Sequence, residues 1–146
     1  MKVAVKTFEE LTNTELYQTM RLRSEVFVVE QDCVYQDLDN KDQKALHVLG
    51  IKKQNIVAYT RIFKPGDYFT NTSIGRVVVK KEERKFGYGK VIMEASLEEI
   101  DKRFPESPIE LSAQTYLVKF YNDLGFKASG EEYLEDGIPH IKMIRK

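Results

Sequence analysis

A basic turn with two glycines follows an apolar run in the middle of the chain and is the clearest candidate for a binding site. Residues 74–89 read IGRVVVKKEERKFGYG and lead into a helical pattern. Gly87 and Gly89 allow backbone N–H groups to approach a ligand, and the first N–H groups of a helix have no partner within it. Three cationic side chains flank the turn: Arg84, Lys85 and Lys90. The segment therefore predicts a site for a polyanion such as a pyrophosphate.

The spacing of this turn excludes two familiar phosphate-binding loops. It has no Gly-Lys-Ser/Thr ending of the Walker type, and it lacks the first glycine of the dinucleotide fingerprint. A plain basic turn that caps a helix remains the alternative.

The same segment, with the spacing Arg84-x-x-Gly87-x-Gly89 after a strand, resembles the acyl-CoA-binding motif of the GNAT superfamily of N-acetyltransferases. Residues 109–126, IELSAQTYLVKFYNDLGF, resemble the later strand and helix of that superfamily, with its Tyr-x-x-x-Gly-Phe ending. Residues 22–42 and 133–143 are similar to the ElaA-like branch, a group of small bacterial acetyltransferases. The resemblance covers nearly the whole chain.

This resemblance implies acetyl-CoA as the co-substrate. Its pyrophosphate would lie on the backbone of the turn, and its pantetheine arm would pair with the backbone of Val77 and Val79. The N–H group of Val77 or Val78 would stabilise the oxyanion. The cofactor-binding residues that the resemblance implies are Val77, Val78, Val79, Arg84, Lys85, Phe86, Gly87, Tyr88, Gly89 and Lys90.

Tyr121 occupies the position of the general acid, four residues before the glycine of the Gly-Phe pair. Its hydroxyl would protonate the leaving thiolate after a neutral amine has attacked the thioester. The alternative is that Tyr121 is one of eight tyrosines and packs on an apolar helix face. The family often has an asparagine near the start of this helix. This chain has Thr115 and Tyr116 there instead, so the resemblance does not establish a cofactor contact at that position.

A general base is also needed, because an amine with a pKa of about 10.4 is almost entirely protonated at neutral pH. The candidates are Glu30, Glu110 and His140, acting directly or through a water molecule. Glu30 and His140 are placed together on the acceptor side, and neither is assigned as the base. His47 alternates with apolar residues and is interpreted as structural.

Composition narrows the other possibilities. The 146 residues suit a single domain, 1–146, and contain 23 basic and 23 acidic side chains without a basic cluster, so nucleic acid is not the expected partner. One cysteine, Cys33, and no long apolar segment favour a cytoplasmic protein outside the membrane. No metal site is expected. The acidic residues after the first helix resemble half a calcium loop, and we interpret them as a solvated loop whose charge could attract a cationic amine: Asp37, Asp39 and Asp42.

The elements that must position these residues follow from hydrophobic periodicity. Strands are expected at 2–7, 45–52, 56–63, 73–80 and 109–113, with a final strand pair from Phe126 onwards. Helices are expected from a Thr12–Glu15 capping box to about Phe27, at 88–103 and at 117–124, and residues 30–44 are expected to form a loop. This order predicts an α/β (α+β) fold with a mixed sheet and helices on both faces. The GNAT resemblance implies about seven mostly antiparallel strands and a splayed parallel pair that forms the acyl-CoA cleft.

The sequence therefore favours an N-acetyltransferase that moves the acetyl group of acetyl-CoA to a primary amine of a small molecule or peptide. Three alternatives stay open: an acyl-CoA sensor without transfer activity, a partner-binding domain without affinity for CoA, and transfer of a longer acyl group. An edge-strand homodimer is compatible with such a sheet. The acceptor is not identified by the sequence.

Overall fold

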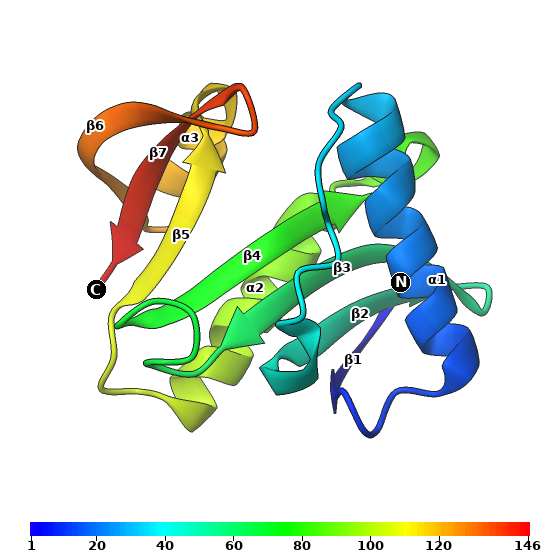
Figure 1. The fold of residues 1–146 in the computed structure, drawn as a ribbon. Coiled ribbons are helices and arrows are strands. Elements are labelled where there is room, and N and C mark those ends of the chain that lie inside the picture. The colour runs from blue at the N-terminus through cyan, green and yellow to red at the C-terminus, as the bar shows by residue number, and fades with distance from the viewer.

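Seven strands form one mixed sheet in the computed structural model, which describes residues 1–146. The order across the sheet is β1-β2-β3-β4-β5-β7-β6, and every neighbouring pair is antiparallel except β4 and β5. The strands are β1 (Lys2–Thr7), β2 (Leu46–Lys52), β3 (Asn55–Phe63), β4 (Thr72–Val79), β5 (Ile109–Gln114), β6 (Lys127–Glu135) and β7 (Ile138–Arg145). The predicted mixed, mostly antiparallel sheet is confirmed (Figure 1).

The first helix begins where its capping box predicts, but the α-helix ends at Arg23, before the expected end near Phe27. Thr12 and Glu15 form the capping box that starts α1 (Asn13–Arg23). The chain then continues as a π-helix over Ser24–Glu30. Helical structure therefore ends at Glu30, where the predicted loop begins, because apolar Val26 and Phe27 pack against the sheet and extend the helical segment. The predicted loop contains one short 3₁₀ helix at its end, Asp42–Lys44.

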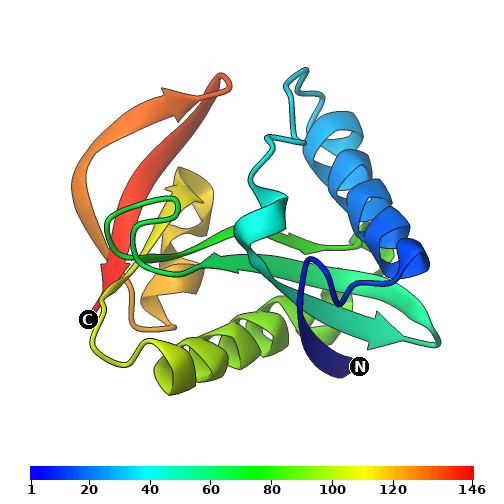
Figure 2. The ribbon, with the colours of Figure 1, turned by 60° about the horizontal axis from the view of Figure 1, so that its bottom comes forward.

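Helices cover both faces of the sheet, as predicted. Leu22 and Val26 pack with Leu49, Tyr59 and Val78 on one face. The long helix α2 (Tyr88–Arg103) and the short helix α3 (Val118–Asn122) pack into the larger core on the other face. Figures 1 and 2 show α1 and α2 on opposite sides of the strands. None of the helices combines the length and apolar character that a membrane span requires.

The parallel strands β4 and β5 part soon after they begin. They pair only through Thr72 with Ile109 and Ser73 with Glu110. Beyond that point β5 pairs with β7 instead, and the β6–β7 hairpin leans away from β4 (Figures 1 and 2). The splayed pair that the family resemblance implies is thus present, and it leaves the last residues of β4 without a neighbour on the β5 side.

A β-bulge in β4 lies at this opening. Val78 is opposite Tyr59 and Gly75 is opposite Arg61, so Arg76 and Val77 together face Thr60. Arg76 has φ of 50°, an uncommon conformation for a residue with a side chain. The bulge bends β4 at the edge of the cleft.

Candidate active site

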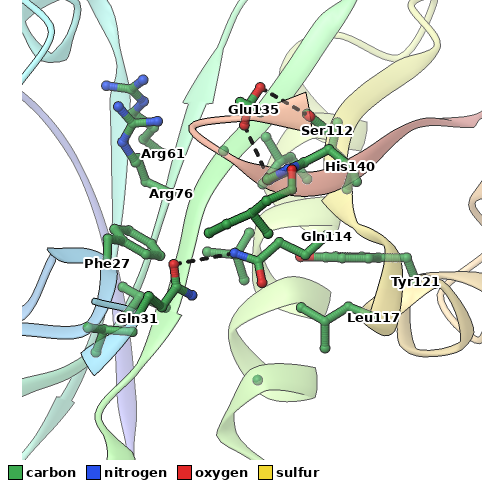
Figure 3. Close-up of a pocket in the computed structure, with 18 of the residues that line it drawn as sticks. Phe27, Gln31, Arg61, Arg76, Ser112, Gln114, Leu117, Tyr121, Glu135 and His140 are labelled. Atoms are coloured by element: carbon green, nitrogen blue, oxygen red, sulfur yellow. Dashed lines mark hydrogen bonds and ion pairs between the residues drawn. The ribbon is translucent and has the colours of Figure 1, made fainter. Parts of the chain in front are cut away.

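A cavity of about 600 Å³ fills the space between the two halves of the sheet. Residues of the π-helix, the following loop, β3, β4 and the start of α2 line one side, and residues of β5, α3 and the β6–β7 hairpin line the other. Figure 3 shows side chains from both sides around it, among them Phe27, Gln31, His140 and Tyr121. Segments distant in sequence therefore meet in one site.

The glycine turn lies at this cavity. A 3₁₀ helix over Lys81–Phe86 leads to Gly87, whose φ of 73° lies in the left-handed region, and α2 starts at Tyr88. Seven of the predicted cofactor-binding residues line the cavity: Val77, Val78, Val79, Arg84, Gly87, Gly89 and Lys90. The N-terminal N–H groups of α2 are therefore next to the cavity, as an anion site requires.

The other three predicted cofactor-binding residues do not line the cavity: Lys85, Phe86 and Tyr88. The Phe86 and Tyr88 rings lie beside the Lys52 ammonium group, which is 4.1 Å and 5.5 Å from the two ring centroids. The side chains of Phe86 and Tyr88 therefore belong to this neighbouring cluster, so for these two residues we expect any contribution to come from the backbone.

Glycine is favoured at positions 87 and 89 for two different structural reasons. A Cβ atom on Gly87 would meet no atom within 4 Å, so the positive φ is what favours glycine there. A Cβ atom on Gly89 would lie 3.6 Å from the Phe120 ring and 3.9 Å from the Val79 side chain. Gly89 thus sits where helix α2 approaches β4 and α3 at van der Waals distance.

Glu30 and Arg84 form an ion pair across the entrance of the cavity. The Arg84 guanidinium donates to both Glu30 carboxylate oxygens, at 2.6 and 2.9 Å, and its Nε donates to the Val79 carbonyl oxygen at 3.1 Å. The π-helix thereby brings the acidic residue that sequence reasoning placed on the acceptor side to the phosphate turn. The pair is partly exposed, so its contribution to stability is small.

Tyr121 lies inside the site. Its ring is 5% exposed and packs edge-to-face on Phe120 and Phe126, and the side chain reaches from α3 towards the cavity (Figure 3). Burial, with a smaller effect from Tyr116, raises the pKa of the Tyr121 hydroxyl. The phenol therefore carries its proton at neutral pH. Tyr116 also lines the cavity, whereas Thr115 does not.

His140 lies opposite Gln114 on the paired strands β5 and β7, and both line the cavity. Its Nδ1 is 2.7 Å from the Ile138 carbonyl oxygen, and its Nε2 is 3.3 Å from Oε2 of Glu135. Glu135 also accepts from the Ser112 hydroxyl at 3.3 Å, and that hydroxyl is hydrogen-bonded to Tyr133. We call Ser112, Tyr133, Glu135 and His140 the hairpin cluster.

Sequence reasoning identified only His140 in the hairpin cluster. Ser112 and Gln114 alternate with the buried Leu111 and Ala113, so this alternation could have indicated one polar face of β5. The Asp136-Gly137 turn, with φ of 53° and 79°, is a local hairpin signal that sets Glu135 opposite Ile138, so this turn could have indicated that Glu135 lies near His140. Glu110, the remaining candidate base, does not line the cavity and accepts from the Asn71 amide at 3.3 Å.

A buried ionic cluster supports the wall opposite the hairpin. We call it the Arg–Asp cluster, and it consists of Arg23, Arg61, Arg76, Asp37, Asp39 and Asp42. The interpretation of the three aspartates as a solvated loop was wrong. Asp37 and Asp42 are 7% and 6% exposed, because arginines from α1, β3 and β4 converge on them. Nor does any group of acidic, histidine or cysteine side chains have a metal-binding arrangement.

Three arginines face three aspartates in this cluster, so its formal charges balance. Burial raises the pKa of Asp39, but hydrogen bonds and positive charge from Arg61 more than offset burial and lower it to about 2. His47 donates from Nε2 to the Asp42 carbonyl oxygen at 2.9 Å and accepts from the Tyr59 hydroxyl at 2.6 Å. Burial lowers the pKa of His47, which is consistent with a neutral, structural role.

Two hydrogen bonds connect the walls of the cavity. The Gln114 amide donates to the Gln31 side-chain oxygen at 3.4 Å, as Figure 3 shows. The Cys33 thiol is 3.4 Å from the Asp136 carbonyl oxygen. The loop after the π-helix and the β6–β7 hairpin thus meet over the site.

Comparisons with known proteins agree with this geometry. Residues 4–146 match the family described as Acetyltransferase (GNAT) domain. The chain is 43% identical over 139 residues to the protein ElaA of Escherichia coli K12, covering 94% of this chain and 91% of that protein. The crystal structure of Escherichia coli ElaA has a TM-score of 0.93 at 40% identity over 99% of each chain. An acyl-CoA N-acyltransferase from Pseudomonas aeruginosa has a TM-score of 0.94 at 38% identity over 100% of each chain.

Proposed function

Because this chain belongs to the GNAT acetyltransferase family, in its ElaA-like branch, we propose that it transfers the acetyl group of acetyl-CoA to a primary amine of a small molecule or peptide. The observation that carries this proposal is the placement of Tyr121 and the Gly87–Gly89 turn in one cavity at the divergence of β4 and β5. Membership of the family supports acyl-CoA-dependent acyl transfer. The acetyl group and the amine acceptor are our proposal.

The residues of the cavity fit a CoA ester. The N-terminus of α2 presents N–H groups for the pyrophosphate, and Arg84 and Lys90 add positive charge beside it. Beyond the divergence from β5, the backbone of Val77 and Val79 is available to pair with the pantetheine amides. These contacts would orient the thioester towards Tyr121.

In the transfer step, the amine nitrogen attacks the thioester carbonyl carbon, and negative charge builds up on the carbonyl oxygen. We assign its stabilisation to a backbone N–H group at the bulge of β4, that of Val77 or Val78. The carbon–sulfur bond then breaks, and the Tyr121 hydroxyl donates its proton to the leaving sulfur. A thiol with an ordinary pKa of about 8.5 is a stronger acid than tyrosine with an ordinary pKa of about 10, so the Tyr121 phenolate readily regains a proton. The nitrogen loses one proton as the amide forms, and this proton restores Tyr121 directly or through solvent.

Of the acceptor-side candidates, His140 is better placed for the amine than Glu30. Glu30 is held by Arg84 at the phosphate turn, whereas His140 lies on β7, on the opposite wall of the cavity. We therefore propose that Glu30 positions Arg84 and that His140 acts on the acceptor amine.

The test is calorimetric titration of the purified protein with acetyl-CoA and CoA, followed by measurement of thiol release with a panel of primary amines. We expect binding of both and amine-dependent thiol release with acetyl-CoA. Binding without release on any amine would favour an acyl-CoA sensor. Absence of binding would contradict the role of the glycine turn.

A further inference from the structure

The hydrogen bonds of His140 fix which ring nitrogen carries its proton. Nδ1 lies 2.7 Å from the Ile138 carbonyl oxygen, and a carbonyl oxygen can only accept a hydrogen bond. Nδ1 must therefore be the donor. In the neutral imidazole, the lone pair is then on Nε2.

This lone pair faces a second acceptor. Oε2 of Glu135 is 3.3 Å from Nε2, and an ionised carboxylate only accepts hydrogen bonds. Nε2 and Oε2 are stable at this distance only when they share a proton or when a third group donates hydrogen bonds to both. The pair is thus suited to a group that brings N–H donors and can release a proton.

The other members of the hairpin cluster hold the pair in this orientation. The Ser112 hydroxyl donates to Oε1 of Glu135 and is hydrogen-bonded to Tyr133, whose ring stacks on His140 at an interplanar angle of 22°. His140 is buried, while the Glu135 side chain is 49% exposed, and both line the cavity. A bound molecule can therefore reach the carboxylate.

The electrostatic surroundings favour a cation at this place. Glu30 is paired with Arg84, and the aspartates of the Arg–Asp cluster are paired with arginines. Glu135 and Asp136 are the cavity-lining carboxylates that no lysine or arginine neutralises. The other titratable groups around His140 come from three segments. They are Tyr133 on β6 and the exposed Lys142 on β7, Asp136 at the hairpin tip, and Cys33 on the loop that contacts this tip.

We propose that Glu135 and His140 together bind the primary ammonium group of the acceptor and remove its proton. This inference rests on the proposed function and assigns a role to Glu135. The ammonium group donates one N–H to Nε2 and another to the carboxylate, about 3 Å from each. Nε2 takes one proton, which leaves a neutral amine with the lone pair that attacks the thioester. The resulting imidazolium forms an ion pair with Glu135, and the proton later passes to solvent through the exposed carboxylate.

The test compares Glu135→Gln with Glu132→Gln, a matched change on the same strand outside the cavity. The glutamine at 135 removes the negative charge and places an amide donor opposite Nε2. With a primary alkylamine at pH 7, we expect kcat/KM to fall at least about tenfold in Glu135→Gln and to stay unchanged in Glu132→Gln. The Kd for acetyl-CoA should stay within about twofold in both.

A second readout separates deprotonation from loss of structure. An analogue of the same amine with three fluorine atoms on the β-carbon is much less basic and is largely neutral at pH 7, so it needs no removal of a proton before attack. The defect of Glu135→Gln should therefore shrink with this acceptor. Glu135→Asp keeps the charge and should retain more activity than Glu135→Gln, and thermal unfolding shows whether each variant is folded.

The outcomes distinguish this inference from the proposed function. If the wild-type chain transfers acetyl groups and Glu135→Gln equals Glu132→Gln, the inference is overturned and the function stands. Equal defects with both amines would also overturn it. If the wild-type chain binds no acetyl-CoA, the proposed function fails, and the inference fails with it.

Discussion

Replacement of Asp42 tests whether the Arg–Asp cluster stabilises the wall of the site. Its Oδ1 accepts from Nη1 of Arg23 at 2.7 Å and from Nη1 of Arg61 at 3.0 Å. The two arginine side chains are 0% and 1% exposed, and the Asp42 side chain is 8% exposed. One carboxylate oxygen thus bridges two buried cations, whose other carboxylate partners are Asp37 and Asp39.

Two substitutions separate the charge of Asp42 from its hydrogen bonds. Asp42→Asn keeps an oxygen in place, so both hydrogen bonds can form to a neutral acceptor. A hydrogen bond to a charged group contributes about 1 kcal/mol more than a neutral one, so two bonds predict a loss of about 2 kcal/mol in unfolding free energy. Asp42→Ala removes both bonds and leaves two buried guanidinium groups with less compensation, which predicts a loss of about 3–5 kcal/mol.

Equilibrium unfolding in urea measures both losses. Asp123→Asn is the matched control, because this carboxylate lies 3.7 Å from Lys119 with 70% of its side chain exposed. The control should change the unfolding free energy by less than about 0.5 kcal/mol. If Asp42→Asn were as stable as the control, the argument that this oxygen neutralises two buried arginines would be refuted.

Three further predictions concern the site and its pH dependence. Tyr121→Phe should lower kcat by about 10²- to 10⁴-fold without changing the calorimetric Kd for acetyl-CoA, whereas equal losses in both would indicate a packing role. Gly87→Asp should weaken acetyl-CoA binding at least about tenfold, because it brings a negative charge to the anion site at φ of 73°. Gly130→Asp, on β6 outside the cavity at φ of 84°, should bind normally. Both Asp39 and His47 have folded-state pKa values below their ordinary values of 3.8 and 6.5. Each group therefore contributes its full stabilisation of the folded state only above its ordinary pKa. Urea unfolding should show the free energy of unfolding falling below about pH 6.5, as His47 is protonated, and falling again from about pH 4 to about pH 2, as Asp39 is protonated.

Local sequence signals were sufficient for most of the elements. The Thr12–Glu15 capping box starts α1, and Lys53 and Gln54, both at positive φ, join β2 and β3 in the short hairpin that was predicted. Gly125, at φ of 93°, follows the last helix as its position suggested. These features depend on residues only a few positions apart, which is why a linear pattern shows them.

The Arg–Asp cluster was missed because its members come from distant segments. An aspartate in a polar stretch looks solvated until Arg23, Arg61 and Arg76 are known to point at it. The change from α-helix to π-helix at Ser24 was likewise not predicted, since the π-helix packs Val26 and Phe27 against the sheet.

The sequence by itself determined the order of the elements, the glycine turn before α2 and the family to which the chain belongs, because each depends on short-range patterns or on residues in a fixed order. Only the tertiary structure decided which side chains share the cavity. The divergence of β4 from β5 brings Glu135 and His140 of the β6–β7 hairpin into the same cavity as Tyr121 and the glycine turn. That divergence depends on which strands pair across long stretches of sequence, and no local pattern specifies such pairing.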